Sequence, residues 1–296
     1  MDNVKAAEKS PVRKQLTEAK RVVIKVGTST ITHENGRFNL TNLEHLCRSI
    51  ANQMNQGREI ILVSSGAIGV GVGRLRLPKK PEAMREKQAV AAVGQCELMS
   101  MYGRLLSDYH YVVAQILLTK DDVDDPITRE NICNTFEALL EQEILPIVNE
   151  NDTVSTHEIY HNGTFGDNDA LSAIVARLVG ADLLIILSDI DGLYDKDPHH
   201  HEDALMVDTV YHIDEAIEKL AGDVGSLLGT GGMKTKLMAA KIASEAGIHT
   251  VIANGSESRI VDAILDGRQV GTLFMAKETE CCLRDEDESD RGLFAI

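Results

Sequence analysis

Six short runs of apolar, mostly β-branched residues alternate along the chain with longer segments whose apolar residues recur at helical spacing. The runs are Arg21–Val26, Glu59–Val63, Tyr111–Leu117, Ile144–Val148, Leu183–Leu187 and Thr250–Ala253. Each run is a continuous apolar stretch with little alternation of polar residues, which is typical of strands that are buried on both faces of a sheet. The pattern therefore predicts at least six strands in a mainly parallel sheet.

The segments between these runs predict helices. They cover about residues 41–57, 82–109, 126–142, 170–178 and 234–246. We expect Thr41 to cap the first of them and Gly57 to end it. Repeated strand–helix–strand units place helices on both faces of a parallel sheet. The expected fold class is therefore α/β, a three-layer α/β/α sandwich with an open, mainly parallel sheet.

Two polar segments interrupt this alternation. Residues 149–169 are too long and polar for a simple connection, and we expect a hairpin or lid over a site there; residues 189–211 predict a second long loop. The ends of the chain differ from the middle as well. We interpret residues 1–20 as a polar N-terminal extension, 21–275 as one domain and 276–296 as an acidic C-terminal tail.

Composition narrows the possible partners. The formal net charge of −16 disfavours binding to nucleic acid or to anionic membranes. No apolar run approaches the roughly 20 residues that span a bilayer, and residues 1–20 contain no apolar signal-peptide core. Five cysteines without a CxxC pair favour reduced thiols over disulfides or a metal site. We therefore expect a cytoplasmic protein.

Polar residues gather where the predicted strands end, which is the edge where parallel sheets bind ligands. Lys25 lies inside the first strand, and a buried lysine is costly unless an anion pairs with it. We interpret it as a cation for a phosphate; the alternative is a lysine that reaches solvent at the strand end. Ser65 and the glycines that follow it could present helix N–H groups to an anion, or form only a tight turn.

Two further polar segments follow the fourth strand. Asn149 and Asp152 suit recognition of a ligand that carries both an amine and a carboxylate. Asp167, Asn168 and Asp169 open the next helix, where capping is the alternative function for part of the segment. Two carboxylates and an amide exceed what a cap needs, which favours a binding or catalytic function.

A polyphosphate site is predicted by two segments near the fifth strand and the last long helix. Ser188 and Asp189 end the strand, and a glycine-rich segment with two hydroxyls and two lysines precedes the helix. That segment differs from the Walker A pattern, because Lys234 stands where a glycine would be required; a surface loop is the alternative. The three histidines at 199–201 indicate a solvated loop more than a metal site.

The order of these motifs resembles that of the amino acid kinase family over about residues 21–275. The motifs are VVIKVGTSTIT (22–32), VSSGAIGVG (63–71), VNENDTV (148–154), FGDNDALSA (165–173), LSDIDGLYDKDP (187–198) and GTGGMKTKLMAAKIA (229–243). Within the family, the chain is most similar to the branch that phosphorylates the side-chain carboxylate of glutamate. The resemblance implies an ATP-dependent transferase of proline biosynthesis.

The resemblance also implies a role for each site residue. Lys25 and Lys236 would flank the transferring phosphoryl group, and Asp169 would hold both lysines. Glutamate would be bound by Ser65, Asn149, Asp152, Asp167 and Asn168. ATP would be bound by Lys25, Ser188, Asp189, Thr230, Gly231, Gly232, Met233, Lys234, Thr235 and Lys236. Mg²⁺ would be held largely by the phosphates of ATP, so that no protein metal site is expected.

Further expectations come from the same resemblance. They include a dimer or tetramer, feedback inhibition by L-proline and transfer of the product to a glutamyl phosphate reductase. Many relatives carry an additional C-terminal PUA domain, but only about 20 residues follow Thr272–Phe274, so we expect the kinase-only form. The alternatives are a non-catalytic amino-acid sensor, a kinase for another carboxylate such as aspartate or N-acetylglutamate, and a fragment of a bifunctional enzyme.

Overall fold

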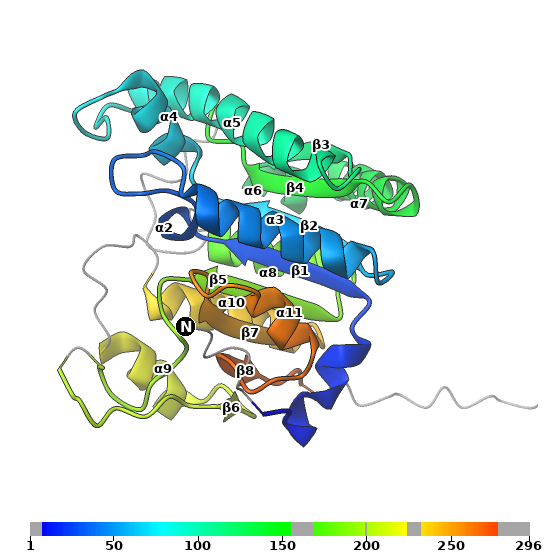
Figure 1. Cartoon of the computed structure of the whole chain (residues 1–296), viewed down its shortest axis with the longest axis vertical. Helices are drawn as coiled ribbons and strands as arrows, with labels where there is room; N and C mark the ends of the chain where they lie inside the picture. The colour runs from blue at the N-terminus through cyan, green and yellow to red at the C-terminus, as the bar shows by residue number, and fades with distance from the viewer. Residues whose placement is uncertain (1–7, 155–167, 199, 224–231, 278–296) are drawn as a thin grey trace, which may run out of the picture.

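An eight-stranded sheet runs through the middle of the molecule (Figure 1). The computed structural model describes residues 8–154, 168–198, 200–223 and 232–277. The strands are β1 Arg21–Val26, β2 Glu59–Ser64, β3 Val113–Leu118, β4 Leu145–Glu150, β5 Leu183–Ser188, β6 Thr209–Val210, β7 His249–Asn254 and β8 Thr272–Phe274. Their order is β3-β4-β2-β1-β5-β7-β8-β6, and every neighbouring pair is parallel except β7 with β8.

Helices cover both faces of this sheet. They are the 3₁₀ helix η1 Pro11–Glu18 and the α-helices α2 Thr28–Ile31, α3 Leu40–Met54, α4 Ala67–Leu75, α5 Met84–Ser107, α6 Lys120–Asp124, α7 Pro126–Glu141, α8 Asn168–Leu178, α9 Glu215–Asp223, α10 Met233–Glu245 and α11 Ile260–Leu265. In Figure 1, α3, α5 and α11 lie in front of the sheet, and α7, α8 and α10 lie behind it. This arrangement confirms the α/β/α sandwich.

The central strand β1 shows how side-chain alternation places residues on the two faces. Val22, Ile24 and Val26 belong to the core under α3 and α5. Val23 belongs to the other core, under α8 and α10. Because successive side chains of a strand point to opposite faces, Lys25 shares the direction of Val23. A lysine within this apolar run is thereby directed toward α8 and α10.

The six predicted strands are confirmed, with boundaries that differ by at most two residues. Two short strands, β6 and β8, were missed, so the prediction of residues 189–211 as loop alone was wrong for its last residues. The cap assigned to Thr41 was also wrong: Asn39 accepts the hydrogen bond from the backbone of Asn42, and Thr41 lies inside α3. Most of the expected lid, residues 155–167, lies outside the described residues.

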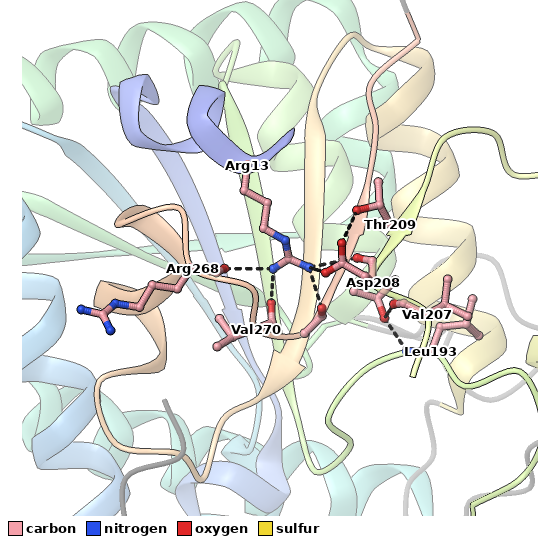
Figure 2. A network of polar contacts seen from close by, with 9 residues as sticks. Arg13, Leu193, Val207, Asp208, Thr209, Arg268 and Val270 are labelled. Carbon is pink, nitrogen blue, oxygen red and sulfur yellow. Dashed lines mark hydrogen bonds and ion pairs between the residues drawn. The ribbon is translucent and has the colours of Figure 1, made fainter. Parts of the chain in front are cut away.

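A buried arginine holds the N-terminal segment against the far end of the sheet (Figure 2). Arg13 of η1 is fully buried and donates to the carbonyl oxygens of Arg268 (3.2 Å), Val270 and Gly271 (2.7 Å). It also donates to the carbonyl oxygen (2.9 Å) and the carboxylate (2.8 Å) of Asp208. Burial lowers the pKa of the Arg13 guanidinium, and the nearby Asp208 carboxylate opposes that shift.

The same network continues into the segment that follows β5. The Thr272 hydroxyl donates to the carbonyl oxygen of Val207 (2.6 Å) and accepts from the backbone N–H of Leu193 (2.8 Å). Thr209 donates to the Asp208 carboxylate (2.9 Å). These bonds join η1, β6, β8 and the segment after β5, so the residues at 11–18 are part of the folded unit.

No helix among the described residues is both long enough and apolar enough to cross a bilayer. The cysteines at 47, 96 and 133 lie in α3, α5 and α7 and are free thiols. Burial raises the pKa of the Cys47 thiol to about 12, which keeps it protonated and unreactive. Cys281 and Cys282 lie outside the described residues.

Candidate active site

Three charged side chains meet at the carboxyl ends of the central strands. The ammonium group of Lys25, on β1, lies 2.5 Å from Oδ1 of Asp169. The ammonium group of Lys236, in the first turn of α10, lies 3.2 Å from Oδ2 of the same carboxylate. All three side chains are at least 94 % buried. The structure therefore brings together the three residues that the sequence predicts as catalytic.

Three elements far apart in the sequence make this cluster. Alternation along β1 directs Lys25 toward α8 and α10, as described above. Asp169 is the second residue of α8, and α8 packs against both β1 and α10. The hydroxyl of Thr235 donates to Oδ2 of Asp169 at 2.9 Å. The carboxylate is therefore held from the strand and from α10 at the same time.

The environment of Asp169 keeps its carboxylate ionised. Complete burial would raise the pKa of this group. The positive charges of Lys25 and Lys236 and the hydrogen bonds to the carboxylate outweigh burial, so the pKa lies below its ordinary value. Two ammonium groups and one carboxylate sum to a formal charge of +1. Together with the N-termini of α8 and α10, this cluster suits an anionic group such as phosphate.

A second set of predicted residues lies on the other face of the sheet, near α4 and α5. Asn149 is buried in β4 and donates from Nδ2 to Oε1 of Gln95 at 2.9 Å. Ser65 is buried directly after β2, and Gly66, with a positive φ of 104°, is the N-cap residue of α4. Asp152 lines a small cleft together with Gln95. The sequence analysis did not single out Gln95, because no local motif marks an amide within a long helix.

The two remaining residues of the predicted glutamate site flank the start of α8. Asn168 is its first residue, and its side-chain oxygen is buried without a hydrogen-bond partner in the described part of the chain. Asp167 lies outside the described residues. The side-chain oxygen of Asn168 can therefore accept a hydrogen bond from a donor group of a ligand.

The described residues of the predicted ATP site lie at the end of β5 and at the start of α10. Ser188 is buried at the end of β5 and donates to the carboxylate of exposed Asp189 at 2.9 Å. Gly232 caps α10, and Lys234 is exposed at its first turn. The Met233 side chain packs into the core under α8 and α10, so only its backbone can face a nucleotide. Thr230 and Gly231 lie outside the described residues.

The part of the chain that the structure describes contains no cluster of metal-binding side chains. No three His, Cys, Asp or Glu side chains there lie close enough together to form a metal site. Of the histidine run, His200 and His201 are exposed, and His199 lies outside the described residues. Asp189 is a hard oxygen donor at the end of β5, of the kind that Mg²⁺ accepts beside phosphate oxygens.

The chain is similar to known proteins over most of its length. A model of the amino acid kinase family matches residues 20–254. A glutamate 5-kinase of Clostridium perfringens is 57% identical over 269 residues, which are 91% of this chain and 100% of that relative. A glutamate 5-kinase of Listeria innocua is 52% identical over 91% of this chain and 98% of its own.

Solved structures show the same fold at low identity. The UMP kinase of Bacillus anthracis has a TM-score of 0.60 and 18% identity, and covers 88% of this chain and 97% of its own. The carbamate kinase of Giardia lamblia, bound to AMP-PNP, has a TM-score of 0.60 and 17% identity, and covers 88% of this chain and 99% of its own.

Proposed function

Because the chain belongs to the amino acid kinase family, we propose that it transfers the γ-phosphoryl group of ATP to the side-chain carboxylate of L-glutamate. The product is γ-glutamyl phosphate, and the reaction is the first step of proline biosynthesis. The glutamate 5-kinases that are 57% and 52% identical over 91% of the chain support this substrate.

One observation carries the chemistry: two buried ammonium groups converge on the single carboxylate of Asp169. The glutamate side chain has an ordinary pKa of about 4.3, so it is already an anion at neutral pH and needs no general base. The barrier is the repulsion between that anion and the phosphoryl group. Lys25 and Lys236 offset this repulsion and stabilise the charge on the equatorial oxygens of the transferring group.

Asp169 acts by positioning these two lysines. Its carboxylate also accepts from Thr235 (2.9 Å), so the cluster is assembled within the folded protein. Fixed cations stabilise a transition state without the cost of reorganising at the moment of reaction. The remaining task is alignment of the two substrates for direct in-line transfer. Trapping a phosphorylated residue in the protein during turnover would contradict this route.

The other predicted residues supply that alignment. In this proposal, ATP lies against Lys25, Ser188, Asp189 and the residues from Thr230 to Lys236. Mg²⁺ would be held largely by the phosphates of ATP, where Asp189 could add an oxygen donor, and the ion would supply neutralisation of the phosphate charge. Glutamate is bound by Ser65, Asn149, Asp152, Asp167 and Asn168. Self-association, inhibition by L-proline and transfer to a glutamyl phosphate reductase belong to the proposal as well.

An assay of substrate choice tests the proposal. ADP release is measured with Mg-ATP and L-glutamate, L-aspartate or N-acetyl-L-glutamate, with hydroxylamine present to trap an acyl phosphate. We expect ADP and hydroxamate to form in equal amounts with L-glutamate. Preference for another carboxylate would keep the kinase and replace the substrate. Measurable ATP binding without turnover of any of the three would favour the amino-acid sensor.

A further inference from the structure

A buried amide in α5 has a hydrogen-bond donor without a partner in the described part of the chain. Gln95 is 92 % buried, and its Nε2 atom makes no hydrogen bond there. A buried N–H without a partner is costly, so native proteins rarely keep one that meets neither a ligand nor water. Gln95 plays no part in the catalytic cluster around Asp169, and its unpaired donor therefore needs a separate explanation.

The orientation of this amide follows from a chain of hydrogen bonds that starts at the backbone. The backbone N–H of Glu150 donates to Oδ1 of Asn149 at 2.9 Å. Nδ2 of Asn149 must then face Gln95, where it donates to Oε1 at 2.9 Å. A backbone N–H can only donate, so neither amide can be turned over without losing a bond. Nε2 of Gln95 is consequently the atom left to donate.

Close packing of two helices fixes where this donor lies. α5 and α4 pack directly against each other (Figure 1). A Cβ atom on Gly94 would lie 1.7 Å from the carbonyl oxygen of Ala67, and one on Gly71 would lie 2.1 Å from that of Val90. Only glycine permits this approach. It sets Gln95 beside Ala67, the first residue of α4, which lies two residues after the predicted substrate residue Ser65.

The donor borders a cleft whose polar groups match an α-amino acid. The cleft is small, and its lining includes Gln95, Ala67, Glu150, Asn151 and Asp152. The carboxylates can attract an ammonium group, while the amide and the N-terminus of α4 favour a carboxylate.

We propose that Gln95 binds the α-carboxylate of L-glutamate through Nε2, while its Oε1 atom holds Asn149 in place. The ammonium group of the same substrate faces Asp152 across the cleft. This inference rests on the proposed function, because it assigns one contact within the glutamate site. Gln95 is then a substrate-binding residue that also positions a second one.

Two substitutions separate the binding role from a purely structural one. In Gln95→Glu, one carboxylate oxygen can still accept from Asn149, but the donor is replaced by an anion that repels the α-carboxylate. In Gln95→Met, of similar size, both interactions are lost. We expect KM for glutamate to rise more than 100-fold in Gln95→Glu and about 10- to 100-fold in Gln95→Met, with KM for ATP unchanged. A structural role alone would leave Gln95→Glu close to the wild type and impair only Gln95→Met.

A change of specificity gives a test that loss of folding cannot imitate. L-Isoglutamine, the α-amide of glutamate, keeps the side-chain carboxylate but presents an NH₂ donor where glutamate has an oxygen. A glutamate side chain at position 95 can accept from that NH₂ group. We therefore expect the ratio of kcat/KM for L-isoglutamine to kcat/KM for L-glutamate to rise at least 100-fold in Gln95→Glu.

The control is Gln88→Glu, a change of the same type on α5 two turns before Gln95 and outside the lining of the cleft. This variant should keep the wild-type ratio. An unchanged ratio in Gln95→Glu, with KM for glutamate within threefold of the wild type, would overturn the inference. Wild-type turnover in the same assay tests the proposed function separately, because it does not depend on Gln95.

Discussion

Two buried clusters of charged side chains, one around Asp169 and the other around Arg13, use their cations in different ways. At Asp169, two lysines share one carboxylate, with N–O distances of 2.5 and 3.2 Å. At Arg13, a single guanidinium meets the carboxylate of Asp208 and four backbone carbonyl oxygens. The Asp169 cluster has two cationic groups around one anionic group. The Arg13 cluster has one cationic group, whose hydrogen bonds go mostly to uncharged carbonyl oxygens.

The difference indicates which cluster serves chemistry. The planar guanidinium of Arg13 directs both terminal nitrogens at fixed backbone acceptors, an arrangement that fastens segments together. A lysine ammonium group has three donors, and two such groups around one carboxylate keep a formal charge of +1 in a buried place. Each ammonium group can therefore donate to a phosphate oxygen while it stays bound to Asp169. The Asp169 cluster is therefore suited to a passing phosphoryl group, and the Arg13 cluster to holding the N-terminal segment.

The largest expected effect is on catalysis at the Asp169 cluster. Lys236→Ala removes one of the two cations that stabilise the transferring phosphoryl group. We expect kcat to fall on the order of 10³-fold, as for other cations that act on this type of transition state. Steady-state kinetics with glutamate and Mg-ATP measure the change. The matched control is Lys241→Ala, because Lys241 lies on the same helix but is exposed and pairs with Glu218 on the surface.

A loss of stability without a loss of kcat in Lys236→Ala would reverse the roles assigned to the two clusters. Lys241→Ala should change neither kcat nor the free energy of unfolding to a measurable extent, because its ion pair is exposed to solvent.

The next effect is on stability at the Arg13 cluster. Arg13→Met keeps much of the side-chain volume but leaves four carbonyl oxygens and the Asp208 carboxylate without their donor. We expect the free energy of unfolding to fall by about 3 kcal/mol, while kcat changes less than threefold. Urea unfolding and steady-state kinetics of the same preparation test both parts.

Arg268→Met is the matched control for Arg13→Met. Arg268 contributes its backbone carbonyl oxygen to the network, and its side chain points away from Arg13 (Figure 2). Its substitution keeps that acceptor, so stability should change by less than about 1 kcal/mol. Equal losses in the two variants would show that the guanidinium of Arg13 is not the source of the stability.

The two clusters also differ in how far sequence alone could identify them. Lys25 interrupts a buried apolar strand, and Asp169 and Lys236 open helices after polar motifs, so periodicity and strand ends pointed to all three. The pairing of both lysines with Asp169 was expected only from the resemblance to the amino acid kinase family. Periodicity could not predict it, because the pairing depends on how α8 and α10 pack against β1. Their predicted roles in phosphoryl transfer stay predictions.

Arg13 gave no comparable signal. It lies in a polar segment that reads as an extension, and its partners are mostly backbone carbonyl oxygens near the other end of the chain, which carry no residue-specific mark. Gln95 was missed for a similar reason, since its partner Asn149 is 54 residues away. The six longer strands were predictable from their apolar runs, whereas β6 and β8 are too short to show a pattern.

The smallest effect concerns the pH dependence of stability. Burial raises the pKa of Asp169, but Lys25 and Lys236 lower it more, so the pKa in the folded protein lies below the ordinary value of 3.8. The unfolded chain therefore binds this proton first as the pH falls. The stabilisation by Asp169 is fully present above pH 3.8 and is lost as the pH falls through the folded-state pKa.

Asp169→Asn lacks this titrating group, so its stability should fall less steeply in acid than that of the wild type. One proton limits the difference between the two slopes to about 1.4 kcal/mol per pH unit. Urea unfolding of both proteins at several pH values between about 6 and 3 measures it. Parallel curves would mean that the two lysines do not hold Asp169 ionised. The distinction between the Asp169 cluster, which suits an anionic ligand, and the Arg13 cluster, which holds the fold together, would then lose its physical basis.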